Sequence, residues 1–289
     1  KVAMYSTIVA VVANIILDPI FIFVMDMGVR GAALATMLSQ VIAVIGQMVI
    51  FLNPKEVIYF HRGIWRLKRD ITMRALGIGM APFLMHMAAC FVVIVLNNQL
   101  KRYGGDMAIA TYGITNRFMF FFAMIVMGLN QGMQPIVGYN FGAKLYPRMV
   151  RTLKLTIMCA TCVMGALWLF GLIWPEGFIR LFTHDEVLVG QSVAPARVML
   201  CTMVMVGFPM VVGNFYTSIG MSNKAIFLSL TRQVLLLIPC ILLLPLLFQK
   251  IGITPIWGVW WSLPICDAMA ALIAAVVVNR DMRKFWLKG

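Results

Sequence analysis

The chain has 289 residues, of which 62% are hydrophobic and only 12% are charged. Because soluble domains usually carry about 25% charged residues, this composition excludes an ordinary soluble protein and indicates an integral membrane protein. The formal net charge of +14 does not indicate nucleic-acid binding, since the basic residues alternate with apolar segments instead of gathering on one soluble surface. We therefore expect the chain to contact the lipid bilayer and no nucleic acid.

Continuous apolar segments of about 20 or more residues predict membrane-spanning helices. The sequence contains eight of them, at residues 2–25, 29–52, 75–99, 107–133, 151–173, 193–219, 224–248 and 254–278. The predicted fold is therefore all-α, a polytopic bundle of about eight transmembrane helices. No signal-peptide pattern opens the chain, and because it begins with Lys1 we expect it to be part of a longer protein.

The distribution of basic residues predicts how these helices are oriented. Most of the 24 Lys and Arg residues fall at span ends that alternate onto one side, which includes the 53–74 connection and the C-terminal tail. The side richer in Lys and Arg is normally cytoplasmic. Both ends of the chain are thus predicted to face the cytoplasm, which places Asp18 and Thr36 in the outer half of the membrane.

The segment 53–74 is the only long polar connection, and it separates the first two spans from the last six. Its aromatic residues stand among basic ones, a pattern typical of an amphipathic stretch on the inner leaflet. We predict three parts: residues 1–52, a cytoplasmic linker at 53–74, and residues 75–289.

Asp18 is the most informative residue, because a carboxylate inside a membrane-spanning helix costs several kcal/mol and usually persists for function. It lies one helical turn after Asn14 and directly before Pro19. If the first two spans form an antiparallel hairpin that turns near Met27, Thr36 lies at the same depth as Asp18. Amide, carboxylate and hydroxyl oxygens together predict a cation or proton site. The alternative is that Asp18 only hydrogen-bonds backbone freed by Pro19.

A second polar feature runs from Gly128 to Lys144 near the inner end of a span. Its glycines allow close helix packing and Pro135 frees a backbone carbonyl. Gln131, Gln134 and Tyr139 are predicted either to line a cavity or to bond neighbouring helices.

Two arginines lie within spans away from the span ends. Arg117, with Asn116 beside it, is expected to face a cavity or a carboxylate, and Asp267 in the last span is a candidate partner. A structural ion pair, or an extended side chain reaching the membrane surface, is an equal alternative for Arg117. Arg232 lies nearer the inner end of its span and is expected to extend to the surface.

Enzymatic and metal chemistry find little support in the sequence. No phosphate-binding loop is present, and no cluster of acid, base or metal ligands suggests a membrane-embedded enzyme. The six cysteines all fall in apolar segments, where structural packing is the expected role. We expect no cofactor, and no metal beyond a Na+ ion at Asp18, Asn14 and Thr36.

At these residues the chain resembles the multidrug and toxic compound extrusion (MATE) family. The resemblance is carried by Asn14–Pro19 with Gly31–Thr36, and by Gln131–Lys144, and it extends over the whole chain. It implies twelve helices in two six-helix lobes that enclose a central cleft. On that plan residues 1–52 are the last two helices of the N-lobe, and residues 75–289 are the six-helix C-lobe.

The resemblance also implies an N-lobe cation site. Bacterial members that have this site use side chains that match Asn14, Asp18 and Thr36, together with an Asp from a first helix that this chain does not contain. Other members carry acidic residues in the seventh and tenth helices. Here the corresponding spans, 75–99 and 193–219, contain no Asp or Glu. Coupling through the N-lobe is therefore the expectation.

The predicted function is secondary active antiport: export of cationic or amphiphilic drugs or metabolites in exchange for Na+ or H+, by a monomeric transporter of the inner membrane. The alternative is a flippase for lipid-linked oligosaccharides with the same two-lobe architecture. Such a protein would need several basic residues in its cleft to bind a pyrophosphate, and only Arg117 and Arg232 lie within spans away from the span ends.

Overall fold

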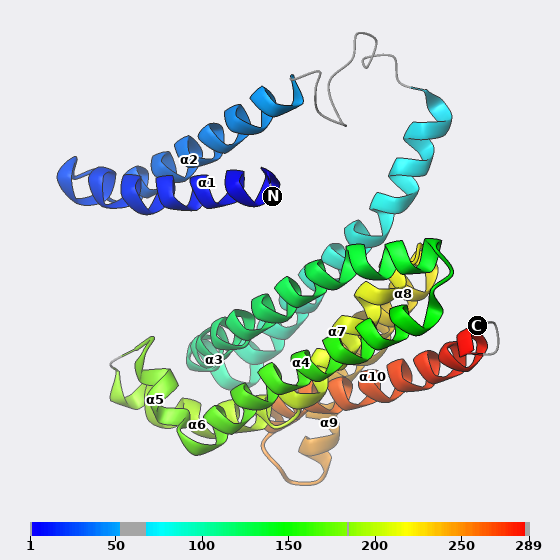
Figure 1. Cartoon of the computed structure of the whole chain (residues 1–289). Helices are drawn as coiled ribbons and strands as arrows, with labels where there is room; N and C mark the ends of the chain where they lie inside the picture. The colour runs from blue at the N-terminus through cyan, green and yellow to red at the C-terminus, as the bar shows by residue number, and fades with distance from the viewer. Residues whose placement is uncertain (1, 53–67, 184, 287–289) are drawn as a thin grey trace. The chain divides into compact units, whose positions relative to one another are not determined.

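The computed structural model describes residues 2–52, 68–183 and 185–286 (Figure 1). Within these ranges the regular elements are all helices, as the composition predicts. The chain divides into two compact units, Lys1–Met73 and Arg74–Gly289, which we call the N-terminal and C-terminal units and describe separately. Most of the predicted linker at 53–74 lies outside the described residues.

The N-terminal unit is a helical hairpin. Helix α1 (Val2–Pro19) continues into a short π-helix, η1 (Ile20–Val24), and helix α2 (Gly28–Phe51) returns antiparallel to α1 (Figure 1). Pro19 lacks a backbone N–H and crowds the preceding turn, which accounts for the departure from α-helical geometry directly after it. The predicted hairpin with its turn near Met27 is confirmed.

Small residues allow the two helices of this hairpin to approach closely. On α2 the buried positions recur every four residues, which places them on one face; they are Gly31, Ala35, Ser39 and Ala43. A Cβ atom at Gly31 would lie 2.6 Å from the backbone oxygen of Phe21. Close backbone contact at small residues is the usual way in which helices associate in lipid.

This contact makes a stability prediction for Gly31. Gly31→Ala would press a methyl group against a backbone carbonyl that cannot rotate away, and should lower the free energy of unfolding by about 1–3 kcal/mol. Gly46→Ala is the matched control on the same helix, since a Cβ there meets no atom within 4 Å. The control should be neutral or stabilising by up to about 1 kcal/mol. Thermal unfolding in detergent measures both, and equal effects would contradict the contact.

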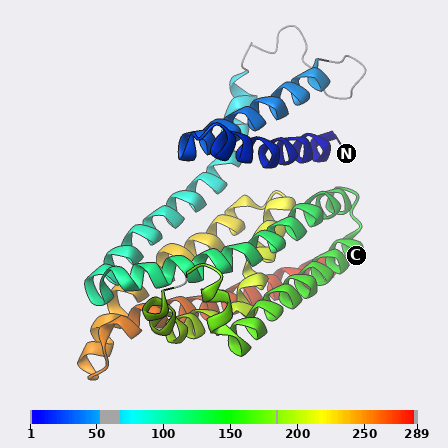
Figure 2. The same cartoon turned by 90° about the vertical axis from the view of Figure 1, so that its left-hand side faces the viewer.

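The C-terminal unit begins with a second hairpin, within the long helical element α3 (Arg69–Gly142). At Gly105 the backbone leaves helical geometry, with φ of 67° and ψ of −163°, and the chain reverses direction, as both views show (Figures 1 and 2). A positive φ is readily adopted only by glycine, so the presence of Gly105 accounts for the position of the turn. The two arms of α3 correspond to the predicted spans 75–99 and 107–133.

The remaining helices complete the unit. In chain order they are α4 (Tyr146–Ile173), α5 (Pro175–Arg180), α6 (Glu186–Leu200), α7 (Met203–Ser218), α8 (Ser222–Leu230), the π-helix η2 (Thr231–Leu237), α9 (Ile238–Lys250) and α10 (Pro255–Trp286). Helices α6 and α7 form one span bent by 49° at their junction. With α3 counted as two arms, the described residues contain helices at all eight predicted spans, although three of them are broken or distorted, by η1, by η2 and by the bend between α6 and α7.

Helix α10 is the central element of this unit. It packs against α4, α6, α7, α8, η2 and α9, and its span is more buried than the others. One apolar cluster joins it to α4 and α7 through residues such as Phe215 and Ala274, and a second joins it to α9 and the first arm of α3 through residues such as Leu100 and Trp260. Any polar side chain on the inner face of α10 is consequently held inside the bundle.

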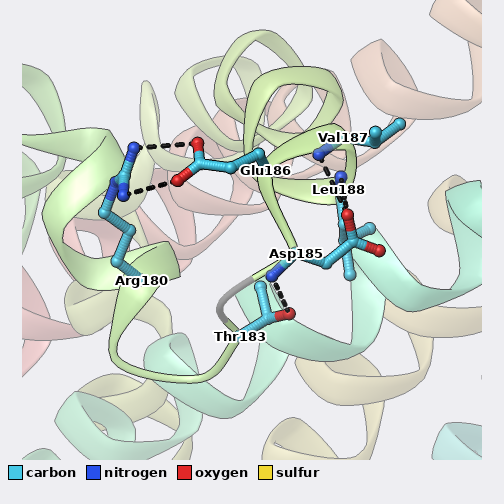
Figure 3. A network of polar contacts seen from close by, with 6 residues as sticks. All are labelled: Arg180, Thr183, Asp185, Glu186, Val187 and Leu188. Atoms are coloured by element: carbon cyan, nitrogen blue, oxygen red, sulfur yellow. Dashed lines mark hydrogen bonds and ion pairs between the residues drawn. The ribbon is translucent and has the colours of Figure 1, made fainter.

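Figure 3 shows the polar contacts at the N-terminus of α6. The Asp185 carboxylate accepts hydrogen bonds from the backbone N–H groups of Val187 and Leu188, at 3.0 and 3.4 Å. Arg180 forms a two-pronged ion pair with Glu186, at 2.9 and 3.0 Å. An acidic N-cap satisfies backbone donors that the first helical turn leaves without partners. This network therefore fixes where the bent α6–α7 span starts.

Candidate functional site

The first candidate site lies on the inner face of the N-terminal hairpin. Along α1 the residues Ser6, Ala10, Asn14 and Asp18 are spaced by four, so their side chains follow one another on one face. Ser6 and Ala10 are buried against α2, and Asn14 and Asp18 are half-buried. Asn14 and Asp18 thus lie on the face of α1 that packs against α2. An amide and a carboxylate are therefore placed beside the contact between two membrane-spanning helices.

Two contacts fix the register of the hairpin. At one end Gln47 Nε2 donates a hydrogen bond to Ser6 Oγ at 3.1 Å, and at the other Gly31 packs against the backbone of Phe21. Counting in turns of four residues from the contact of Ser6 with Gln47 brings Asp18 level with Ala35, and Thr36 is the next residue, about 1.5 Å further along the helix axis. The hairpin thus places Thr36 about one residue from the level of Asp18, close to the depth that counting from the turn predicts.

The polar atoms of this site are not satisfied within the hairpin. Asp18 Oδ1 and Asn14 Nδ2 are both buried and have no hydrogen-bond partner among the described residues. Thr36 Oγ1 donates to the carbonyl of Ala32 on its own helix, at 2.9 Å, and the residue is exposed. The structure therefore brings Asn14 and Asp18 to one face and Thr36 to nearly the same level, without a hydrogen bond that joins the three.

The alternative role for Asp18, a hydrogen bond to backbone groups that Pro19 leaves without a helical partner, is not seen in this structure. Within residues 2–52 the Asp18 carboxylate accepts no hydrogen bond from the backbone. A buried polar atom in lipid that lacks a partner costs several kcal/mol unless something binds it. The chemistry that fits such an oxygen is a proton or a cation.

A second buried carboxylate lies in the C-terminal unit. Asp267, in the middle of α10, accepts a hydrogen bond of 2.8 Å from Nε of Arg232 on η2, and Nη2 of the same guanidinium makes an ion-pair contact of 2.6 Å. Both contacts end on the same oxygen, Oδ1. Asp267 has only 7% of its side-chain surface exposed, whereas Arg232 has 32%.

This pair corrects two expectations from the sequence. Arg232 does not extend to the membrane surface, because its guanidinium turns into the bundle to neutralise Asp267. Arg117, the expected candidate partner of Asp267, is exposed on the second arm of α3. The sequence placed both arginines in spans but could not tell which helix face each would occupy.

The other polar residues predicted to line a cavity or to pack between helices are exposed, like Arg117. They all lie on the second arm of α3 and are exposed in the C-terminal unit: Asn116, Gln131, Gln134 and Tyr139. Asn130, beside Gln131, behaves differently, since it is only 2% exposed and neither of its amide atoms has a partner among the described residues. Its place on the stripe with Val126, Met133 and Val137 was a signal that could have revealed it.

A third polar contact was not anticipated from the sequence. Asp281, near the end of α10, forms an ion pair with Lys224 at the start of α8. The hydroxyl of Tyr216, from the end of α7, donates to the same oxygen of Asp281 at 2.8 Å. The signal was present, because each residue lies at the end of a span on the side predicted to be cytoplasmic.

The described residues thus form a multi-pass helical membrane protein that carries buried charged groups within its spans. The model of the MatE family matches residues 82–242, which is more than half of the chain. The chain belongs to the MatE family, whose members are membrane transporters and not enzymes.

Individual relatives agree with this assignment. The chain is 29% identical over 277 residues to the multidrug export protein MepA of Staphylococcus saprophyticus, and 31% identical over 281 residues to that of Staphylococcus aureus. Each match covers 96% of this chain and 59% of the relative, so the chain spans about three fifths of the length of these proteins.

Solved structures show the same fold. A MOP superfamily transporter from Pyrococcus furiosus superposes with a TM-score of 0.85 at 21% identity, over 98% of this chain and 62% of that one. A reverse polarity of the binding pocket is said to suggest a different function for that transporter. At this level of identity the likeness concerns the fold alone.

Proposed function

We propose that the full-length protein is a secondary active antiporter that exports cationic or amphiphilic small molecules in exchange for Na+ or H+. The observation that carries this proposal is the buried Oδ1 of Asp18, which has no partner within the hairpin. The multidrug export activity of the similar staphylococcal proteins supports it. Asn14 and Thr36 complete the coupling site as the amide and hydroxyl neighbours of Asp18.

The mechanism follows from charge balance in a low-dielectric site. In one state of the transporter a Na+ ion or a proton neutralises Asp18, and in the other the carboxylate is free to favour a positively charged compound. Each ligand shifts the equilibrium between inward- and outward-open states only by its differential affinity for them. Binding of the coupling ion from outside therefore favours release of the exported cation on that side.

The setting of the protein belongs to the same proposal. The chain supplies the last two helices of an N-lobe and a six-helix C-lobe, and the remaining helices are supplied by the rest of the protein. The excess of Lys and Arg on one side supports a cytoplasmic C-terminus in the inner membrane. We propose a monomer, since alternating access between two lobes needs no second copy.

The test is transport by the full-length protein in proteoliposomes. An inward Na+ gradient and an inward proton gradient are imposed separately, and the movement of ethidium is followed by fluorescence. Efflux that depends on one gradient supports antiport and identifies the coupling ion. Flipping of a fluorescent lipid-linked oligosaccharide, without gradient-dependent ethidium transport, would replace this proposal with the flippase reading.

A further inference from the structure

The pair formed by Arg232 and Asp267 lies too deep to be a surface contact. Arg232 is ten residues into the span that begins at Ser222, which is about 15 Å at 1.5 Å per residue and half of a hydrocarbon core of about 30 Å. Asp267 is similarly placed, twelve residues into the span that begins at Pro255. Both charges are therefore at mid-membrane depth.

The exposure of Arg232 identifies which side of the C-terminal unit it faces. About a third of its side-chain surface is open, although the residue lies at mid-membrane depth. An open guanidinium at this depth does not face lipid tails, because ionised groups inside a membrane turn toward protein or water. In the full-length protein this face therefore borders a water-filled space or another part of the protein, and Asp267 lies directly behind it.

The helical backbone is irregular where the pair sits. Arg232 belongs to the π-helix η2, a geometry that is rare and frequently occurs at functional sites. Its two neighbours in the chain, Thr231 and Gln233, each carry a buried side-chain oxygen without a partner in the described residues. Irregular backbone and unpaired oxygens in the membrane are features of binding regions in transporters.

One carboxylate oxygen of Asp267 accepts no hydrogen bond from the described residues. The Arg232 guanidinium makes its hydrogen bond and its ion-pair contact to Oδ1, and Oδ2 receives no hydrogen bond from any described residue. The Asp281 carboxylate at the other end of α10 is more fully engaged, with both Lys224 and Tyr216 as partners. Of the two ion pairs that the described side chains of α10 make, the one at mid-membrane depth is thus the one that can accept another ligand.

We propose that Asp267 is a cation-binding carboxylate of the C-terminal unit, at which an exported organic cation takes the place of the Arg232 guanidinium. The exchange conserves the charge at the carboxylate, because one monocation replaces another. The released guanidinium moves toward the open side, where part of it already lies. The inference rests on the proposed function in one respect, that the exported compounds are organic cations.

The surroundings favour an organic cation over a metal ion. The residue beside Asp267, Cys266, belongs to a buried cluster with Met199, Leu237 and Trp260. An apolar setting of this kind suits a large, weakly hydrated cation better than a small, strongly hydrated one. In the described part of the chain no group of three or more His, Cys, Asp or Glu residues could hold a metal ion, and Asp267 therefore belongs to no such group.

Equilibrium binding of ethidium to the detergent-solubilised full-length protein tests this assignment, measured by fluorescence polarisation on the folded fraction. Arg232→Gln frees the carboxylate and should tighten binding by about tenfold, or about 1.4 kcal/mol. Asp267→Asn should weaken it by about as much. The double variant, Arg232→Gln with Asp267→Asn, keeps a neutral hydrogen-bonding pair and should bind as weakly as Asp267→Asn, so the result survives if a single variant fails to fold.

Asp281→Asn is the matched control. It removes the carboxylate of the other ion pair between α10 and the span that contains α8 and η2, and it should leave the ethidium affinity unchanged. Equal affinities in the wild type and the double variant would overturn the proposal and identify the pair as purely structural. Ethidium transport by the wild type would then still support antiport. A wild-type protein that neither binds nor transports ethidium would overturn both.

Discussion

Replacing Asp18 with asparagine in the full-length protein is expected to abolish gradient-driven efflux while raising thermal stability. Asparagine keeps the shape of the side chain but cannot carry a proton or neutralise a cation. If Asp18 couples transport to the ion gradient, ethidium efflux in proteoliposomes should fall to the level of empty vesicles. Unchanged gradient-dependent efflux would exclude Asp18 as the coupling residue.

The stability gain distinguishes a coupling role from a structural one. A buried carboxylate oxygen without a partner is a cost to the folded state, and neutralising it should stabilise the protein by about 1–3 kcal/mol. A residue that held the hairpin together would do the opposite on substitution. Loss of activity with a gain in stability is the expected signature of a functional site maintained against its folding cost.

Asp26 provides the matched control on the same hairpin. It is exposed in the turn between η1 and α2, with a φ of 51°, a conformation that asparagine tolerates as well as aspartate. Asp26→Asn removes the same charge from the same unit and should change neither efflux nor stability. A loss of efflux in both variants would indicate a general effect of charge on the hairpin instead of a site at Asp18.

The N-terminal hairpin was predictable because its information is local. Apolar length defined the two spans, and equal counts on either side of Met27 placed Asp18 level with Thr36. Sequence counting does not give the rotation of each helix, and rotation decides which side chains meet. Thr36 is one residue after the buried Ala35, and that rotation of about 100° leaves it exposed with its hydroxyl on its own backbone.

The ion pairs of the C-terminal unit were less accessible to sequence reasoning. Arg232 and Asp267 are separated by 35 residues, and their meeting depends on how η2 packs against α10. A π-helix rotates the side chains that follow it relative to those before it, and no periodic pattern in the sequence predicts where a π-helix forms. The prediction that Arg232 extends to the surface used distance from the span end alone, which carries no information about direction.

The contact among Lys224, Asp281 and Tyr216 is expected to be a major stabilising element of the C-terminal unit. It joins the end of α7 and the start of α8, which are neighbours in the chain, to the distant end of α10. Lys224→Met would leave the buried Asp281 carboxylate without its ammonium partner. We expect the free energy of unfolding to fall by about 2 kcal/mol, less than for a fully buried pair because Lys224 is itself partly exposed.

A second substitution separates the ion pair from general packing. In the double variant Lys224→Met with Asp281→Leu, no charge is left without a partner, and the free energy of unfolding should return to within about 1 kcal/mol of the wild type. Arg180→Met is the control, because it breaks an ion pair of ideal geometry whose side chains are 53% and 71% exposed. That loss should stay below about 1 kcal/mol, since water already solvates both charges. Thermal unfolding in detergent orders the three variants, and a double variant no more stable than Lys224→Met would show that packing, and not the uncompensated charge, dominates.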